Sequence, residues 1–137
     1  TGLAFGPDGA VYVATLTGFP FPVGGSRVIK LEDNNNDGDA LDEGESYVYA
    51  DGFTAATDVA FEPSGSMLVT EYSQNMLGLA EIGFGESGRY GGRLVRWHDG
   101  KSTVIASGLV SPTAVAVVSG RIYVSEEFAG RVRIIKE

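Results

Sequence analysis

The sequence contains no cysteine and a single histidine, His98. The lack of cysteine excludes disulfide bonds, thiolate metal sites and a cysteine nucleophile. His98 stands beside Asp99-Gly100, a dipeptide typical of tight hairpin turns, which indicates an exposed turn residue. No serine is placed to form a catalytic pair with it. Any chemistry in this chain therefore has to come from other side chains.

Basic clusters and long apolar runs are also missing. The ten Lys and Arg residues are spread along the 137-residue chain, which leaves no basic footprint for nucleic acid. No apolar run approaches the ~20 residues that a membrane-spanning helix needs. The net charge of −8 comes mainly from residues 32–45, which hold seven of the 18 carboxylates and no base. The acidity therefore belongs to one local segment.

A phrase of about 15 residues occurs three times along the chain. It reads TGLAFGPDGAVYVAT from Thr1, TDVAFEPSGSMLVTE from Thr57 and TAVAVVSGRIYVSE from Thr113, with successive threonines 56 residues apart. Alternating apolar residues, a glycine-containing turn and a second alternating segment indicate two antiparallel strands. A fixed period of this length is typical of propellers and other repeat arrays.

Two further strands are predicted in each unit. Third strands are expected at 27–31, 93–97 and 131–135, and fourth strands at 47–50 and 103–106. Repeated four-stranded units are propeller blades. We therefore predict an all-β fold formed by a single propeller segment of about three blades, the last without its fourth strand. The expected blades span residues 1–56, 57–112 and 113–137.

An arc of three blades leaves two apolar faces uncovered, because propellers normally close a ring of about four to eight blades. Two arrangements would complete this ring. Two copies would form a six-bladed ring with two-fold symmetry, or the chain would be part of a longer propeller. We expect the homodimer.

The acidic segment contains DNNNDGD at residues 33–39. Oxygen-bearing side chains at alternate positions, followed by glycine, match the first half of a calcium-binding loop. The second half departs from this pattern, because Gly44 stands where a bidentate glutamate belongs. One interpretation is a calcium loop, and the other is a solvated turn without metal. The predicted ligands are Asp33, Asn35, Asp37, Asp39 and Asp42.

Two long connections, at residues 17–25 and 73–92, are expected at the opposite end of the blades from the acidic segment. They carry aromatic residues on stretches rich in glycine and proline, which could line a ligand pocket or a protein contact. The alternative is that these loops fold back over the edge of their own blades. The predicted contact residues are Phe19, Phe21, Phe84 and Tyr90.

Three carboxylates occupy positions where the repeats differ. Glu71 and Glu126 end second strands where the first repeat has Thr15, and Asp58 stands where the other repeats have Gly2 and Ala114. All are expected near the mouth of the axial channel, where they could hold a divalent cation or act as acid and base. The alternative is a structural role in which they accept hydrogen bonds between blades.

The opening phrase resembles the repeats of NHL-type and SMP-30-like six-bladed propellers. The stretch LTGFPFPVGGSRV at residues 16–28 is similar to one in the ScyD/ScyE family, propeller proteins associated with scytonemin biosynthesis. The resemblance implies a propeller about twice this length and a periplasmic or secreted location. Our leading prediction is a binding or scaffold module that acts through the face bearing residues 19–23 and 73–92, and the alternative is a lactonase-like metal-dependent hydrolase. The hydrolase would use Asp58, Glu71 and Glu126.

Overall fold

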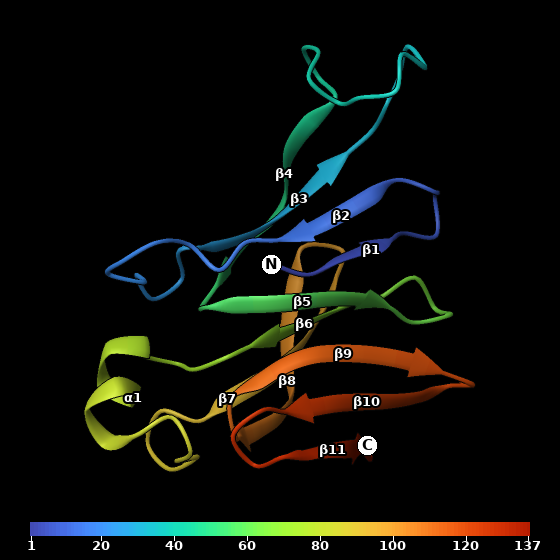
Figure 1. Ribbon diagram of the computed structural model, residues 1–137. Helices are drawn as coiled ribbons and strands as arrows, with labels where there is room; N and C mark the ends of the chain where they lie inside the picture. Colours follow the sequence, from blue (N-terminus) through green and yellow to red (C-terminus); the bar gives the residue numbers. More distant parts are fainter.

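The computed structural model describes residues 1–137 and contains 11 strands in three antiparallel sheets, with one short helix (Figure 1). The first sheet comprises β1 (Leu3–Phe5), β2 (Val11–Ala14), β3 (Ser26–Leu31) and β4 (Ser46–Phe53). The second comprises β5 (Ala56–Phe61), β6 (Met67–Glu71), β7 (Gly92–His98) and β8 (Lys101–Leu109). The third comprises β9 (Pro112–Val118), β10 (Arg121–Glu126) and β11 (Arg131–Ile135). The predicted fold class is confirmed.

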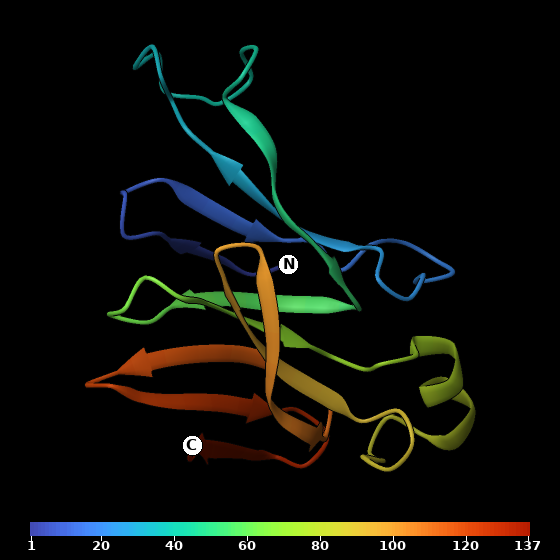
Figure 2. The same ribbon diagram turned by 180° about the vertical axis from the view of Figure 1, so that it is seen from behind.

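The three sheets fan out from a row of inner strands. Strands β1, β5 and β9 run beside one another, and within each sheet the later strands follow outward in chain order (Figures 1 and 2). The connections β2–β3 and β6–β7 lie at the same end as the sheet-to-sheet connections, while the acidic segment lies at the tip of β3–β4. This arrangement is that of propeller blades around an axis.

The core consists of two apolar clusters, one in each joint between neighbouring sheets. In the first, Tyr12 and Val28 of the first sheet pack with Met67 and Val69 of the second. In the second, residues on the other side of the middle sheet pack with the third sheet; these are Leu68, Leu94 and Leu109 against Val115, Ile122 and Val124. Every residue of β6 is buried, because this strand has a neighbouring sheet on both sides.

The observed strands differ from the predicted ones mainly in the fourth strand of the first and second blades. Strands β4 and β8 are longer than the predicted segments, because irregularities in their pairing let each strand continue through a glycine, Gly52 or Gly108. His98 ends β7 and is exposed, as predicted, but its Nδ1 lies 3.3 Å from the Ser66 hydroxyl, a neighbour that the sequence spacing did not indicate. The structure has no helix with the length and apolar character required to cross a membrane.

The connection predicted as a loop at residues 73–92 contains helix α1 (Met76–Ile82). The Asn75 side chain begins this helix by accepting a hydrogen bond of 3.0 Å from the backbone N–H of Gly78. Only seven residues are helical, and two glycines, Gly78 within the helix and Gly83 after it, weaken the sequence signal.

Candidate functional site

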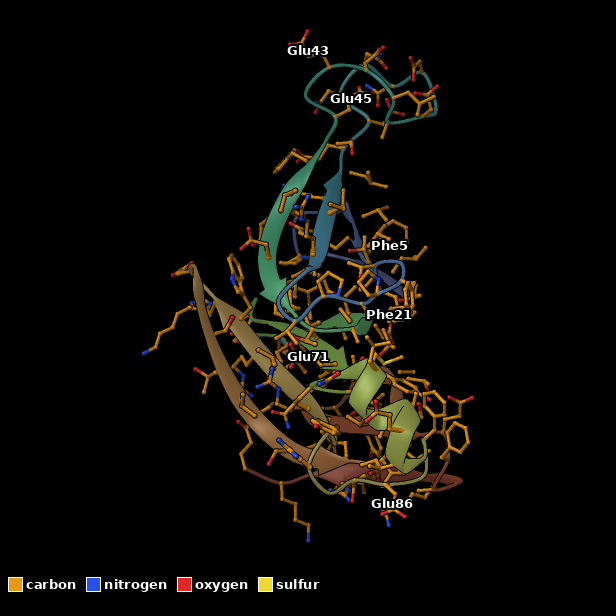
Figure 3. All side chains as sticks on the ribbon, turned by 90° about the vertical axis from the view of Figure 1, so that its left-hand side faces the viewer. Phe5, Phe21, Glu43, Glu45, Glu71 and Glu86 are labelled. Carbon is orange, nitrogen blue, oxygen red and sulfur yellow. The ribbon has the colours of Figure 1, made fainter.

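The long connections and the β10–β11 turn gather at one end of the blades, which we call the loop face (residues 15–25, 72–91 and 127–130). Figure 3 views the molecule from this end, with Phe21 on its loop above α1. Several large apolar side chains are exposed there: Phe19, Val23, Leu77, Ile82, Phe84 and Phe128. Exposed apolar side chains gathered at one end of a protein are typical of a contact surface.

Phe84 and Phe128 form a stacked aromatic pair on the loop face. Their ring centroids are 5.7 Å apart with an interplanar angle of 23°. The Tyr72 ring packs edge-to-face on Phe84, with 6.3 Å between the two ring centroids. The Ser111 hydroxyl donates a 2.6 Å hydrogen bond to the carbonyl of Phe84. The pair therefore joins the connection of the second blade to a turn of the third. Sequence reasoning missed Tyr72 and Phe128, although each follows closely after a second strand.

Phe19 and Phe21 form a second aromatic pair, on the connection of the first blade. Their centroids are 6.3 Å apart in an edge-to-face geometry, and Phe19 is 80% exposed. The loop is fixed at its base, because the backbone N–H of Gly24 donates a 2.9 Å hydrogen bond to the hydroxyl of Thr54. The first blade therefore presents Phe19 to solvent from a supported loop.

Tyr90 has a supporting position beside α1. Its ring lies against Gly78, where an added Cβ would come within 2.5 Å of the ring, so only glycine leaves room for it. The Ser73 hydroxyl donates to the carbonyl of Tyr90 at 2.7 Å, and the Arg89 guanidinium lies 5.2 Å from the ring centroid. Tyr90 thus stabilises the helix that forms part of the loop face.

Glu71 lies in the joint between the first and second blades and is only 1% exposed. Its Oε1 accepts a 2.7 Å hydrogen bond from the backbone N–H of Thr54, which belongs to the preceding β4–β5 connection. Its Oε2 accepts a 2.6 Å hydrogen bond from Arg93 on β7. The carboxylate therefore connects the end of the first blade to β6 and β7 of the second. Glu71 is labelled in Figure 3.

Glu126 repeats this arrangement in the next joint. It accepts a 2.7 Å hydrogen bond from the backbone N–H of Val110 and a 2.6 Å hydrogen bond from Arg131, with Arg133 at 3.2 Å. Burial raises the pKa of Glu126, but the hydrogen bonds from Arg131 and Val110 and the charges of both arginines outweigh it, so the net pKa is lowered. Glu126 is therefore held in its charged form.

Asp58 lines a shallow depression of about 390 Å³ at the inner ends of the first strands, together with Thr1, Gly2, Thr57, Thr113 and Ala114. Its Oδ2 accepts a 2.9 Å hydrogen bond from the backbone N–H of Val115 in the next blade. The missing side chain of Gly2 leaves the space for its other oxygen, since an added Cβ would lie 1.9 Å from Oδ1. The first repeat therefore has glycine at this position because a larger side chain would collide with Asp58 of the second repeat.

The structure does not bring these three carboxylates together. Each one bonds to groups within its own joint, and no three acidic or histidine side chains are grouped so that they could hold a metal ion. The arrangement matches the structural role that the sequence left open for Asp58, Glu71 and Glu126. Their residue types alone could not reveal the backbone donors that they serve.

The predicted calcium ligands lie on an exposed loop that hydrogen bonds internally. Asp33 accepts from the backbone N–H groups of Asp37 and Gly38, and the Asn35 amide donates to Asp37 and Asp42. Asp39 accepts from the backbone N–H of Leu41. Sequence reasoning left out Glu45, which is buried and accepts from the backbone N–H groups of Asn34 and Asp42. Glu45 anchors the base of the loop.

Comparison with known proteins relates this chain to one structural class. No protein-family model matches the sequence, and no curated protein matches it. An X-ray structure described as a "putative gluconolactonase" is similar with a TM-score of 0.62 and 18% identity, over 98% of this chain and 43% of that chain. At this identity the likeness shows the fold alone, and it is a propeller-type fold. The chain spans less than half the length of that protein.

Proposed function

We propose that this chain is a propeller binding module that holds its ligand or partner on the loop face. The observation that carries the proposal is the exposure of Phe19, Phe84 and Phe128, which belong to two aromatic pairs on supported connections, Phe19 with the half-buried Phe21 and Phe84 with Phe128. Aromatic side chains on fixed supports contribute large contact areas and lose little conformational freedom on binding. Such residues dominate the binding energy of contact surfaces.

The chemistry of the loop face favours a planar apolar group. The Phe84 and Phe128 rings are nearly parallel, so they offer flat surfaces for stacking. Phe19, which is 80% exposed, adds a third aromatic ring to the loop face from the first blade. The charged residues of these segments are mainly acidic, with Glu81, Glu86 and Glu127 against the single base Arg89. A neutral or cationic aromatic ligand fits this surface better than an anion.

A hydrolase with catalytic carboxylates is the second candidate, and the fold likeness to the "putative gluconolactonase" favours it. Glu71 and Glu126, however, already accept hydrogen bonds from arginines and backbone N–H groups, so acid or base catalysis would break the joints that they stabilise. Only Asp58 lines an open depression. These contacts support the binding module over the hydrolase.

The finer family and setting of the chain are part of the same proposal. The GFPFPVGG stretch forms the connection that presents Phe19, and its likeness to ScyD/ScyE propellers supports a relationship with that family. A periplasmic or secreted location follows from this relationship.

Titration with indole, followed by two-dimensional ¹H–¹⁵N NMR, tests the proposed function. We expect the largest shifts at residues 18–24, 84–90 and 127–130, and we expect both Phe19→Ala and Phe128→Ala to weaken binding. Leu41→Ala is the matched control, because Leu41 is an exposed apolar residue on the distant acidic loop. Shifts centred on Asp58, or binding that is equal in all variants, would contradict the proposal.

A further inference from the structure

The outer side of the first sheet is an uncovered apolar surface, which we call the first-blade face. The pairing of β1 with β2 and of β2 with β3 places its main residues on one side of the sheet: Leu3, Phe5, Val11, Val13 and Ile29. Phe5 is 72% exposed. An aromatic residue this exposed on a regular strand indicates a missing neighbour.

The outer side of the third sheet is a second uncovered apolar surface, which we call the third-blade face. The pairing of β10 with β9 and β11 places Ala116, Tyr123, Val132 and Ile134 on this side. Val132 is 64% exposed, and a shallow hollow of about 200 Å³ lies between Ala116, Tyr123 and Val132. The two ends of the arc are therefore both apolar.

Residues on these two faces occupy the same repeat positions as residues that pack in the joint between the first and second blades. In that joint Tyr12 is 3% exposed and its ring meets Phe61 in an edge-to-face contact at 4.8 Å. Tyr123 has the position of Tyr12 in the third repeat, and Phe5 has the position of Phe61 in the first repeat. The third-blade face thus carries one half of this contact, and the first-blade face carries the other.

The aliphatic positions around this contact correspond in the same way. Val132 has the position of Val28 on one side of the joint, and Leu3 has the position of Val59 on the other. The first three strands of the end faces therefore match the sides of the internal joint, while Ala50 and Phe53 of β4, which also pack in that joint, have no counterpart in the three-stranded third sheet. Within one arc the two end faces lie at opposite ends and do not meet (Figure 2).

We propose that a second copy of this chain covers both faces and closes the propeller. The third-blade face of each copy packs on the first-blade face of the other, so that Tyr123 meets the partner's Phe5 in two identical joints related by a two-fold axis. The row of inner strands β1, β5 and β9 then continues into the second copy.

The closing joint differs from the internal joints because it lacks their carboxylate links. Thr15 stands where the second blade has Glu71, and Ala114 stands where it has Asp58. The proposed joint therefore relies on apolar contacts, and one charged substitution on either face is enough to weaken it. Dimerisation through the two end faces does not depend on ligand binding at the loop face.

Sedimentation equilibrium of the 137-residue chain with face-specific variants tests this proposal. We expect wild-type chain to have twice the 14.4 kDa monomer mass in the micromolar range. We expect Phe5→Asp and Val132→Asp each to raise the dissociation constant by about tenfold or more. Both side chains are exposed in the single chain, so circular dichroism should show folded variants. Leu41→Asp, which lies on neither face, should dimerise like the wild type.

Mixing the two variants gives the decisive result. The Phe5→Asp chain keeps an intact third-blade face and the Val132→Asp chain an intact first-blade face, so a mixed dimer contains one wild-type joint and one joint with both substitutions. A second charge in a joint that is already disrupted costs less than disruption of an intact joint, because substitutions at sites in contact are not additive. We expect the mixture to dimerise more tightly than either variant alone. A monomer at all concentrations, masses that grow beyond the dimer, or a mixture no tighter than the separate variants would overturn the proposal.

Discussion

Glu71 accepts a 2.7 Å hydrogen bond from the backbone N–H of Thr54, across the joint between the first two blades. Glu126 makes the same kind of bond to Val110 across the second joint. A buried N–H at the end of one blade is thus satisfied by a carboxylate that ends the second strand of the next. This repeated link gives a structural reason for the glutamates at equivalent positions of the second and third blades.

Removal of the Glu71 carboxylate should destabilise the fold. Glu71→Ala leaves the Thr54 N–H unsatisfied and Arg93 without its partner, so we expect a loss of about 2–3 kcal/mol in the free energy of unfolding. Urea denaturation would measure this loss. Glu43→Ala is the control, since Glu43 lies exposed on the acidic loop (Figure 3) and should change stability by less than about 0.5 kcal/mol. Equal stabilities of the two variants would refute the structural role of Glu71.

The lowered pKa of Glu126 predicts a stability change in acid. Because its pKa in the folded chain lies below the ordinary value of 4.5, its contribution is complete above that value and is lost as the pH falls through the folded pKa. The stability difference between wild type and Glu126→Gln should therefore shrink as the pH is lowered below about 4.5. Urea denaturation over a pH series would measure it. A difference that does not change with pH would disprove the charged role of Glu126.

Gly2 should tolerate no side chain, because Asp58 occupies the space beside it. An added Cβ would lie 1.9 Å from Asp58 Oδ1 and 2.7 Å from Asp58 Cα, so both the side chain and the neighbouring strand would have to move. We expect Gly2→Ala to lower the free energy of unfolding by about 1–3 kcal/mol. Gly18→Ala is the control, since no atom lies within 4 Å of its added Cβ. Thermal unfolding that is unchanged in Gly2→Ala would contradict this close packing.

Calcium binding at residues 33–42 stays a prediction, and it has a simple test. If Asp33, Asn35, Asp37, Asp39 and Asp42 are ligands, millimolar calcium should raise the melting temperature of chelator-treated protein, because a ligand of the folded state stabilises it. Asp37→Ala should abolish this increase and Glu43→Ala should keep it. If calorimetric titration with calcium gives no heat and the melting temperature is unchanged, the predicted calcium site is ruled out.

The sequence predicts most of the fold because the repeats place alternating apolar residues and turn glycines at a fixed period. It does not predict α1, which is short and depends on the Asn75 cap and on packing with Tyr90. The contact residues Phe19 and Phe21 could be proposed from the sequence, because glycine and proline mark their loop.

The contacts between blades could not be predicted from one sequence. Glu71 and its donor Thr54 are 17 residues apart, and Gly2 and Asp58 touch across a full repeat. Phe128 was missed for the same reason, because its partner Phe84 belongs to another blade. Such pairs become visible only when the inner strands are placed side by side.

Small-angle X-ray scattering of the wild-type chain at high micromolar concentration is the most direct test of ring closure by two copies. Two copies closed into one propeller should give twice the 14.4 kDa chain mass and a radius of gyration of about 19 Å, as expected for a compact protein of that combined length. A mass of one chain with a radius of gyration of about 14 Å would contradict the closed ring.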